Sequence, residues 1–347
     1  MLQHLRQLLS RLRSRRASPA YDQRLRAEIE RYRAVANVHD LPEIFHCWSN
    51  KYIAPKMAEV LGVTGVDQFY ARYIQQYADE NPGTDVVIAS IGAGNSDTEV
   101  RVAALLRAAG LIRFRFRCLD INPAMLQRGR DAAAQQGLGQ HFEFLETDVA
   151  RWREAGPLGV VMANHSLHHI EDLEGTFARI HQAIGAGGYF LTCDMIGRNG
   201  HMRWPEALAV VHDIWRTMPD RYKYNHQLRR FEALYENWDC SKEGFEGIRA
   251  QDILPLLVER FAFEAFVAFG NIPDLFVDRG FGHNLSPQNP EDVAFVDRIG
   301  ALNDQLIDAG RIKPTQMIAV LRTRSVRPCR HHRHWTPEYC VRRPAAG

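Results

Sequence analysis

Apolar runs separated by helix-length segments recur through the middle of the chain. Such runs are typical of strands that are buried on both faces of a parallel sheet, and the helical spacers predict right-handed βαβ crossovers between them. Together with two later apolar runs, they predict an α/β, doubly wound, mostly parallel seven-stranded sheet. The predicted strands are residues 85–91, 114–119, 142–145, 159–163, 189–192, 261–269 and 317–322.

The first apolar run leads directly into a glycine turn, Gly92-Ala93-Gly94, and then into a helix expected over 98–109. Glycines let the backbone turn sharply and let a ligand approach closely, while the free N–H groups at the helix start face that ligand. This arrangement indicates a nucleotide-like ligand at the carboxyl end of the strand. A dinucleotide fingerprint requires a third glycine where Asp97 stands, and this carboxylate disfavours a pyrophosphate. The residues therefore favour an adenosine ligand without phosphate.

Polar residues follow the next strands where each one ends. Asp120 follows the second strand, and its carboxylate can accept hydrogen bonds from both ribose hydroxyls. Asp148 follows the third strand and can accept from an adenine amino group. Ile121 and Val149 stand beside these two carboxylates and can sandwich the adenine ring. The fourth strand runs into Asn164 and a histidine-rich loop.

The segments SIGAGNSD, CLDINPAML, ETDV, MANHSLHHI and GAGGYFL occur in the order and at the spacing of one known family. On these segments, which span residues 85–194, the chain resembles the class I S-adenosylmethionine-dependent methyltransferases. The resemblance implies a Rossmann-like fold with an antiparallel strand near its end, and S-adenosyl-L-methionine as the cofactor. The cofactor-binding residues that it implies are Gly92, Ala93, Gly94, Asp97, Asp120, Ile121, Asp148, Val149 and Asn164.

Two departures from the family pattern concern the methionine end of the cofactor. Ser90 stands where the family often has an acidic residue, and Ser96 stands where it often has a third glycine. We expect Asp97 to take part of the role of these missing groups.

Catalysis of methyl transfer to a hydroxyl benefits from a general base, and histidine is the natural base near neutral pH. His165 is the first candidate because it is nearest to the tip of the fourth strand. Asp194 at the tip of the fifth strand is the second, as a base or as a residue that orients the acceptor. A turn or helix-capping role is the alternative for Asp194. For His168 and His169 a structural role is the favoured interpretation. The Cys and His residues near the C-terminus fit no closed zinc pattern, so we expect no metal site.

Changes in composition and pattern along the chain divide it into segments. The pre-sheet helices include Trp48, Lys51 and Tyr52 as candidate lid residues, with core packing as the alternative for Trp48 and Tyr52. Helices are also expected over 204–218, 225–238, 250–260 and 291–309. The expected segments are a basic helical extension (1–35), a helical cap (36–82), a cofactor-binding core (83–196 and 248–324), helical acceptor-side insertions (197–247 and 271–315) and a disordered basic tail (325–347).

The composition does not point to nucleic acid or to a membrane-spanning segment. The formal net charge is only +2, so no global field points to nucleic acid, and no apolar run is long enough to cross a membrane. The basic, leucine-striped residues 1–16 are typical of a helix on an anionic membrane or a partner; a solvated extension and a mitochondrial-type transit peptide have the same composition. Six scattered cysteines without a C-x-x-C motif favour reduced thiols in the cytoplasm. The sequence does not indicate an oligomeric state.

The function that we expect is S-adenosylmethionine-dependent methylation of a small metabolite or glycan, on oxygen rather than on nitrogen or carbon. The aromatic and basic insertions suit an anionic or sugar-like acceptor. Two alternatives from other classes are a non-catalytic binding protein with a methyltransferase fold and a nicotinamide-dependent oxidoreductase.

Overall fold

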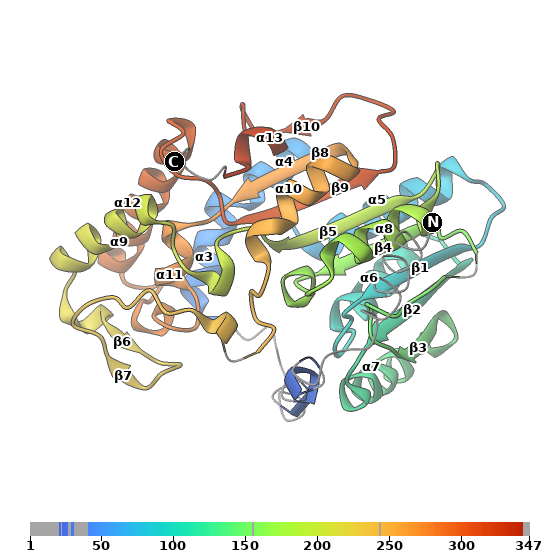
Figure 1. The fold of residues 1–347 in the computed structure, drawn as a ribbon, viewed down its shortest axis with the longest axis horizontal. Helices are drawn as coiled ribbons and strands as arrows, with labels where there is room; N and C mark the ends of the chain where they lie inside the picture. The colour runs from blue at the N-terminus through green and yellow to red at the C-terminus, as the bar shows by residue number, and fades with distance from the viewer. Residues whose placement is uncertain are drawn as a thin grey trace, which may run out of the picture.

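A computed structural model describes residues 21, 23–26, 29–30, 41–154, 156–242 and 244–342. Its centre is a twisted sheet with helices on both faces (Figure 1). The strands of this sheet are β1 (Val86–Ile91), β2 (Phe114–Asp120), β3 (Phe142–Glu146), β4 (Val160–Asn164), β5 (Tyr189–Met195), β8 (Ala262–Phe269), β9 (Gln316–Arg322) and β10 (Arg330–His331). The helices are α3 (Glu43–Tyr52), α4 (Ala54–Leu61), α5 (Val66–Glu80), α6 (Asp97–Ala108), α7 (Pro123–Gln135), α8 (Leu173–Ile184), α9 (Pro205–Thr217), α10 (Ala250–Arg260), α11 (Ile272–Val277), α12 (Pro290–Asp308) and α13 (Pro337–Cys340).

The order of the strands is β10-β8-β9-β5-β4-β1-β2-β3. Strand β9 is antiparallel to both of its neighbours, and all the other pairs are parallel. The seven predicted strands are therefore confirmed, and β10 is an eighth that the sequence did not predict. Because β1 to β5 all run in the same direction, their carboxyl ends meet at one edge, where ligands of such sheets bind.

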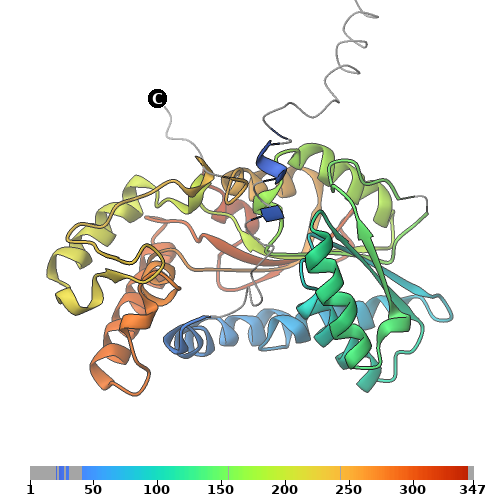
Figure 2. The ribbon, with the colours of Figure 1, turned by 90° about the horizontal axis from the view of Figure 1, so that it is seen from below.

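Helices cover the sheet from both sides, as the parallel pairing requires. Figure 2 shows α3, α4 and α5 along one face and α8 on the other, where it packs against α10. The buried stripe of α5 consists of Phe69, Tyr70, Tyr73 and Ile74. The Tyr70 hydroxyl donates to the carbonyl of Ala163 at 3.1 Å, so this helix is fixed close to the tip of β4.

The candidate lid residues of α3 are anchored to α12 instead. Trp48 is buried in the core. The Tyr52 hydroxyl donates to the carbonyl of Asp297 at 2.9 Å, and the Lys51 ammonium pairs with the Asp297 carboxylate at 2.6 Å. For Trp48 the core-packing alternative is therefore correct, whereas Tyr52 and Lys51 are bonded to α12. None of these three residues is among those that line the cavity at the cofactor-binding edge of the sheet, which argues against a lid role.

The insertion after β5 differs from the expectation of two helices. The first predicted helix is α9, but residues 225–238 form a hairpin of β6 (Tyr224–Asn225) and β7 (Arg230–Phe231) and a following loop. The Asn225 side-chain oxygen accepts from the backbone N–H groups of Gln227 and Leu228, at 3.1 and 3.0 Å. This turn chemistry competes with helix formation, so the helical prediction for 225–238 is wrong.

The tail is ordered through residue 342, contrary to the prediction of disorder. Strand β10 pairs with β8, and Trp335 and Cys340 are buried. Arg330 donates to the Val60 carbonyl and the Tyr73 hydroxyl, at 2.7 and 2.6 Å. The prediction of disorder relied on the basic composition alone. The partners of Arg330 lie on helices that are distant in the chain, so the local sequence could not reveal them.

Three further predictions concern the N-terminal extension, membrane-spanning helices and the cysteines. Most of the basic extension, including residues 1–16, lies outside the described residues. Within the described part of the chain, no helix has the length and apolarity that a membrane crossing needs. The six cysteines are free thiols.

Replacing Trp335 by alanine tests the packing of the tail. Its ring is fully buried and its indole N–H donates to the Asp308 carboxylate at 2.7 Å. Loss of this ring should lower the free energy of unfolding by about 3–5 kcal/mol, measured by denaturant titration. Val326→Ala, at a half-exposed position of the same segment, should leave the midpoint unchanged. Equal midpoints for Trp335→Ala and the wild type would contradict the packed tail.

Candidate functional site

A large cavity opens at the carboxyl ends of the parallel strands. Its volume is about 2280 Å³, and it is lined by the loops after β1, β2, β3 and β4 and by the insertion after β5. Pockets for single small ligands usually measure about 300–1,000 Å³. The cavity therefore has room for a nucleoside-sized cofactor and a second molecule side by side.

The predicted glycine turn lies against the predicted ribose-binding carboxylate. Gly92 and Gly94 both have a positive φ, 64° and 53°, which explains the glycines. Asp120 accepts from the backbone N–H of Gly94 and from that of Asn122, each at 2.8 Å. These two bonds orient the carboxylate and leave lone pairs on both oxygens for a ligand that lies in the cavity. Asp97 is the first residue of α6 and also lines the cavity, as does Ala93.

The predicted adenine end of the site is covered by a segment that the sequence did not place there. Ile121, Asp148 and Val149 all line the cavity. The Tyr21 hydroxyl donates to one oxygen of Asp148 at 3.1 Å, and the carbonyl of Ile29 accepts from the Asn122 amide at 3.1 Å. Parts of the N-terminal extension thus reach the site, and their short, basic sequence gave no signal of this contact.

A carboxyl group of the following helix lies beside Ser90, the position at which the family often has an acidic residue. The Ser90 hydroxyl donates to Glu99 of α6 at 2.5 Å, and Glu99 is buried and lines the cavity. Burial raises the pKa of Glu99 from its ordinary value of 4.5 to about 7. A carboxyl group is therefore present near the glycine turn, but from position 99 instead of position 90.

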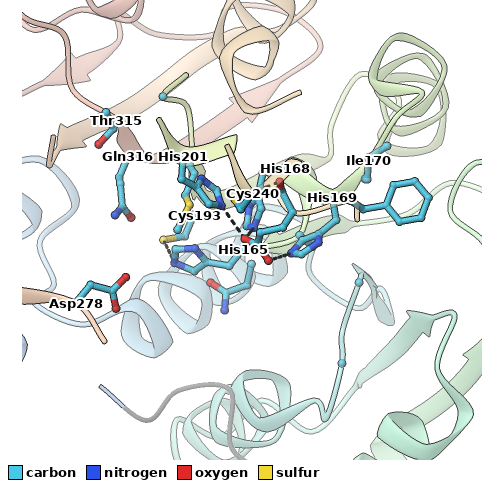
Figure 3. Close-up of a pocket in the computed structure, with 18 of the residues that line it drawn as sticks. His165, His168, His169, Ile170, Cys193, His201, Cys240, Asp278, Thr315 and Gln316 are labelled. Carbon is cyan, nitrogen blue, oxygen red and sulfur yellow. Dashed lines mark hydrogen bonds and ion pairs between the residues drawn. The ribbon is translucent and has the colours of Figure 1, made fainter. Parts of the chain in front are cut away.

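Asn164 and His165 stand at the tip of β4, as predicted, and both line the cavity. The Asn164 amide donates to the Thr98 hydroxyl at 3.3 Å, which ties this tip to the start of α6. His165 has a left-handed backbone, with φ 50°, and its N–H donates to the Cys193 carbonyl at 2.7 Å. This backbone constraint holds the His165 ring close to the Cys193 thiol, with its Nε2 at 3.5 Å from the sulfur (Figure 3).

Asp194 is not among the described residues that line the cavity. Its fully buried carboxylate accepts from the backbone N–H groups of Ser166 and Leu167, at 2.9 and 2.7 Å, and from Nδ1 of His168 at 2.6 Å. The predicted role as a base or acceptor-orienting residue is therefore wrong, because donors from the loop after β4 occupy the carboxylate. The turn-forming alternative is correct, and Asp194 orients His168.

His168 is in turn linked to two residues that the sequence did not indicate, His201 and Glu246. Nε2 of His168 lies 3.4 Å, and Nε2 of His201 2.7 Å, from the same oxygen of Glu246. Burial alone lowers the pKa of His168, but the carboxylates of Asp194 and Glu246 raise it to about 10. Burial likewise opposes ionisation of Glu246, yet the hydrogen bonds from the two histidines hold its pKa far below the usual range.

Part of the chain is similar to known proteins. Residues 90–192 match the family described as a methyltransferase domain. Trans-aconitate 2-methyltransferase of Klebsiella pneumoniae (strain 342) is 37% identical over 103 residues, which are 30% of this chain and 36% of that enzyme. The chain thus spans about a third of the length of this curated relative.

Two solved structures are also similar. Geranyl diphosphate C-methyltransferase from Streptomyces coelicolor A3(2) is 9% identical, with a TM-score of 0.46 over 89% of this chain and 99% of that one. The O-methyltransferase from a trans-AT PKS multienzyme of Brevibacillus brevis is 12% identical, with a TM-score of 0.40 over 73% and 71%.

The central part of the chain, residues 90–192, is a methyltransferase domain. The class predicted from the strand-tip motifs, the S-adenosylmethionine-dependent methyltransferases, is thereby confirmed for this part of the chain. S-adenosyl-L-methionine is the cofactor of this class. The glycine turn, the oriented Asp120 and the adjoining cavity fit its adenosine part.

Glu99 should make stability depend on pH. Between about pH 4.5 and 7 the folded chain holds a proton on Glu99 that the unfolded chain has released. Raising the pH through this window should therefore lower the free energy of unfolding, and Glu99→Gln should reduce that fall. Thermal unfolding at several pH values measures it. The exposed Glu338→Gln should keep the wild-type pH dependence, and an unchanged slope in Glu99→Gln would contradict the raised pKa.

Proposed function

We propose that this protein transfers a methyl group from S-adenosyl-L-methionine to a small-molecule acceptor held in the same cavity. The observation that carries the proposal is the joining of the glycine turn, Asp120 and the histidine loop in one cavity that the insertion after β5 closes. The methyltransferase-domain match and the curated methyltransferase relative support it. The insertion is the part of the chain that we expect to select the acceptor.

An oxygen acceptor that carries negative charge suits the lining best. Arg203 of the insertion lines the cavity and is only 8% exposed. Its Nη1 donates to the carbonyl of His201 at 3.0 Å, and among the described residues its Nε has no hydrogen-bond partner and no carboxylate pairs with it. A buried cation of this kind costs free energy unless an anion compensates it. Trans-aconitate, the substrate in the relative's name, is such an anion and is a first acceptor to test.

The chemistry assigns a simple role to the protein. When bound, the cofactor would supply an electrophilic methyl group on a sulfonium. An acceptor oxygen would bond to this carbon in line as its bond to sulfur breaks, with S-adenosylhomocysteine as the leaving group. Holding the acceptor in place supplies much of the acceleration of such a displacement. His165 lines the cavity beside Asn164, and we assign to it the removal of the proton from an acceptor hydroxyl. A carboxylate acceptor would need no base, so the effect of a His165 substitution also distinguishes these two kinds of oxygen acceptor.

Calorimetric titration with S-adenosylmethionine, S-adenosylhomocysteine and NADH tests the cofactor. The first two should bind and NADH should not. Asp120→Ala removes a charged hydrogen-bond acceptor and should weaken cofactor binding by about 1.5–3 kcal/mol. Asp131→Ala, on the exposed face of α7, should bind like the wild type. Equal affinity in Asp120→Ala would reject the placement of the ribose.

Release of S-adenosylhomocysteine tests turnover on a panel of carboxylates, phenols and sugars. With a hydroxyl acceptor, His165→Ala should lower kcat by about 10²–10⁴, as expected for loss of a general base, with little change in cofactor affinity. His212→Ala, at an exposed position of α9, is the matched control and should keep its activity. Full turnover of a hydroxyl acceptor by His165→Ala would exclude His165 as the base.

A further inference from the structure

Three side chains of types that commonly bind metal ions come from separate segments and lie close together at the cavity. His168 lies in the turn η2 (Leu167–His169), His201 ends the turn η3 (Asn199–His201), and Glu246 lies in the loop before α10. Their nitrogen and oxygen atoms all lie within 4.8 Å of one another. Figure 3 shows the rings of His168 and His201 close together, beside His165 and His169. Each of the three side chains also lines the cavity.

The backbone fixes these three segments to one another. The Ile248 N–H donates to the carbonyl of His168 at 3.1 Å, and the Gly200 N–H donates to the carbonyl of Gly247 at 2.9 Å. A Cβ at Gly247 would lie 3.0 Å from the Gly200 nitrogen, so the close approach requires a glycine there. His201 itself has a left-handed backbone, with φ 55°. Backbone hydrogen bonds between the three segments therefore hold His168, His201 and Glu246 close together.

Asp194 orients the histidine at the centre of the group. Its carboxylate accepts from Nδ1 of His168 at 2.6 Å, which directs Nε2 of that ring towards Glu246. A carboxylate behind a histidine, bonded to the nitrogen that does not bind metal, is the usual support of a metal-ligating imidazole. Because Asp194 is fully buried and held by the N–H groups of Ser166 and Leu167, this support is rigid.

We propose that His168, His201 and Glu246 bind a divalent transition-metal ion such as Zn²⁺. Two imidazole nitrogens and one carboxylate oxygen suit Zn²⁺, Co²⁺ or Fe²⁺, whereas Mg²⁺ and Ca²⁺ prefer oxygen ligands alone. Ligand atoms bound to zinc at about 2.0–2.1 Å lie about 3.3 Å apart. The separations of 3.4 and 2.7 Å from the Glu246 oxygen are close to this value. Binding of the ion would displace to solvent the protons that the two imidazoles donate to Glu246.

Three protein ligands leave at least one position of the ion open, which is the arrangement of catalytic rather than structural zinc. Since all three ligands line the cavity, the open position faces the space that the acceptor would occupy. An oxygen of an anionic acceptor would fit there. This consequence rests on the proposed function, whereas cation binding itself does not.

The experiment is a titration of the chelator-treated full-length protein with Co²⁺, whose visible absorption reports histidine and carboxylate ligation, followed by competition with Zn²⁺. The wild type should bind about one Co²⁺ tightly at this site, with displacement by Zn²⁺. His201→Ala and Glu246→Gln should each weaken binding roughly tenfold or more, as expected for loss of a ligand. Circular dichroism checks that each variant is folded. One folded variant of the two is sufficient to test the proposal.

The tail supplies the matched control, because it is rich in histidine, a metal-ligating residue type. His332 pairs with Glu59 at 2.6 Å, and His334 contacts the carbonyl of Asp308 at 3.2 Å. The double variant His332→Ala/His334→Ala should keep the wild-type spectrum and affinity. The proposal is overturned if the wild type binds no Co²⁺, if the tail variant alone loses it, or if His201→Ala and Glu246→Gln bind it unchanged. Because no cofactor or acceptor is present, failure here is distinct from failure of methyl transfer.

Discussion

The buried carboxylate of Asp194 is the constraint on which the histidine side of the site depends. It sits at the end of β5 and accepts from the loop after β4, so one ionised group fixes the relative position of two strand tips. Burial raises the free energy of a charge, and here the backbone N–H groups and the His168 ring compensate it. Removing this side chain would leave four aligned donors, the N–H groups of Ser166, Leu167 and Met195 and the His168 ring, without their acceptor. The loop that carries His165 and His168 would then lose the group that shapes it.

The cofactor half of the site could be predicted from the sequence because its residues follow directly from strand ends. A buried strand is recognisable by its apolar run, and the first polar residues after it must lie at the carboxyl edge of the sheet. Asp120 and Asn164 are of this kind, and the structure places both at the cavity. The same rule gave the right position but the wrong role for Asp194. The position of a residue at a strand end follows from the topology of the sheet. Its role depends on its hydrogen-bond partners, which the hydrophobic pattern of the sequence does not reveal.

The residues that were missed come from segments whose contacts are distant in the chain. Glu99 lies in the first turn of α6, and only the folded turn between β1 and this helix brings it to Ser90. His201 and Glu246 stand in irregular loops, where neither helical nor strand periodicity gives a signal. Tyr21 comes from a segment whose composition alone predicted a basic helical extension. Composition describes a segment in isolation, and these residues acquire their roles from partners elsewhere.

The pairing of β10 with β8 has a consequence for the outer edge of the sheet. An uncovered edge strand offers unpaired N–H and C=O groups to other chains and promotes aggregation. Strand β8 is almost wholly buried, and it is the tail that supplies its outer neighbour. Strand β10 thus covers part of the outer edge of the apolar strand β8. Shortened forms of this protein should therefore retain the chain through residue 342 if they are to stay monodisperse.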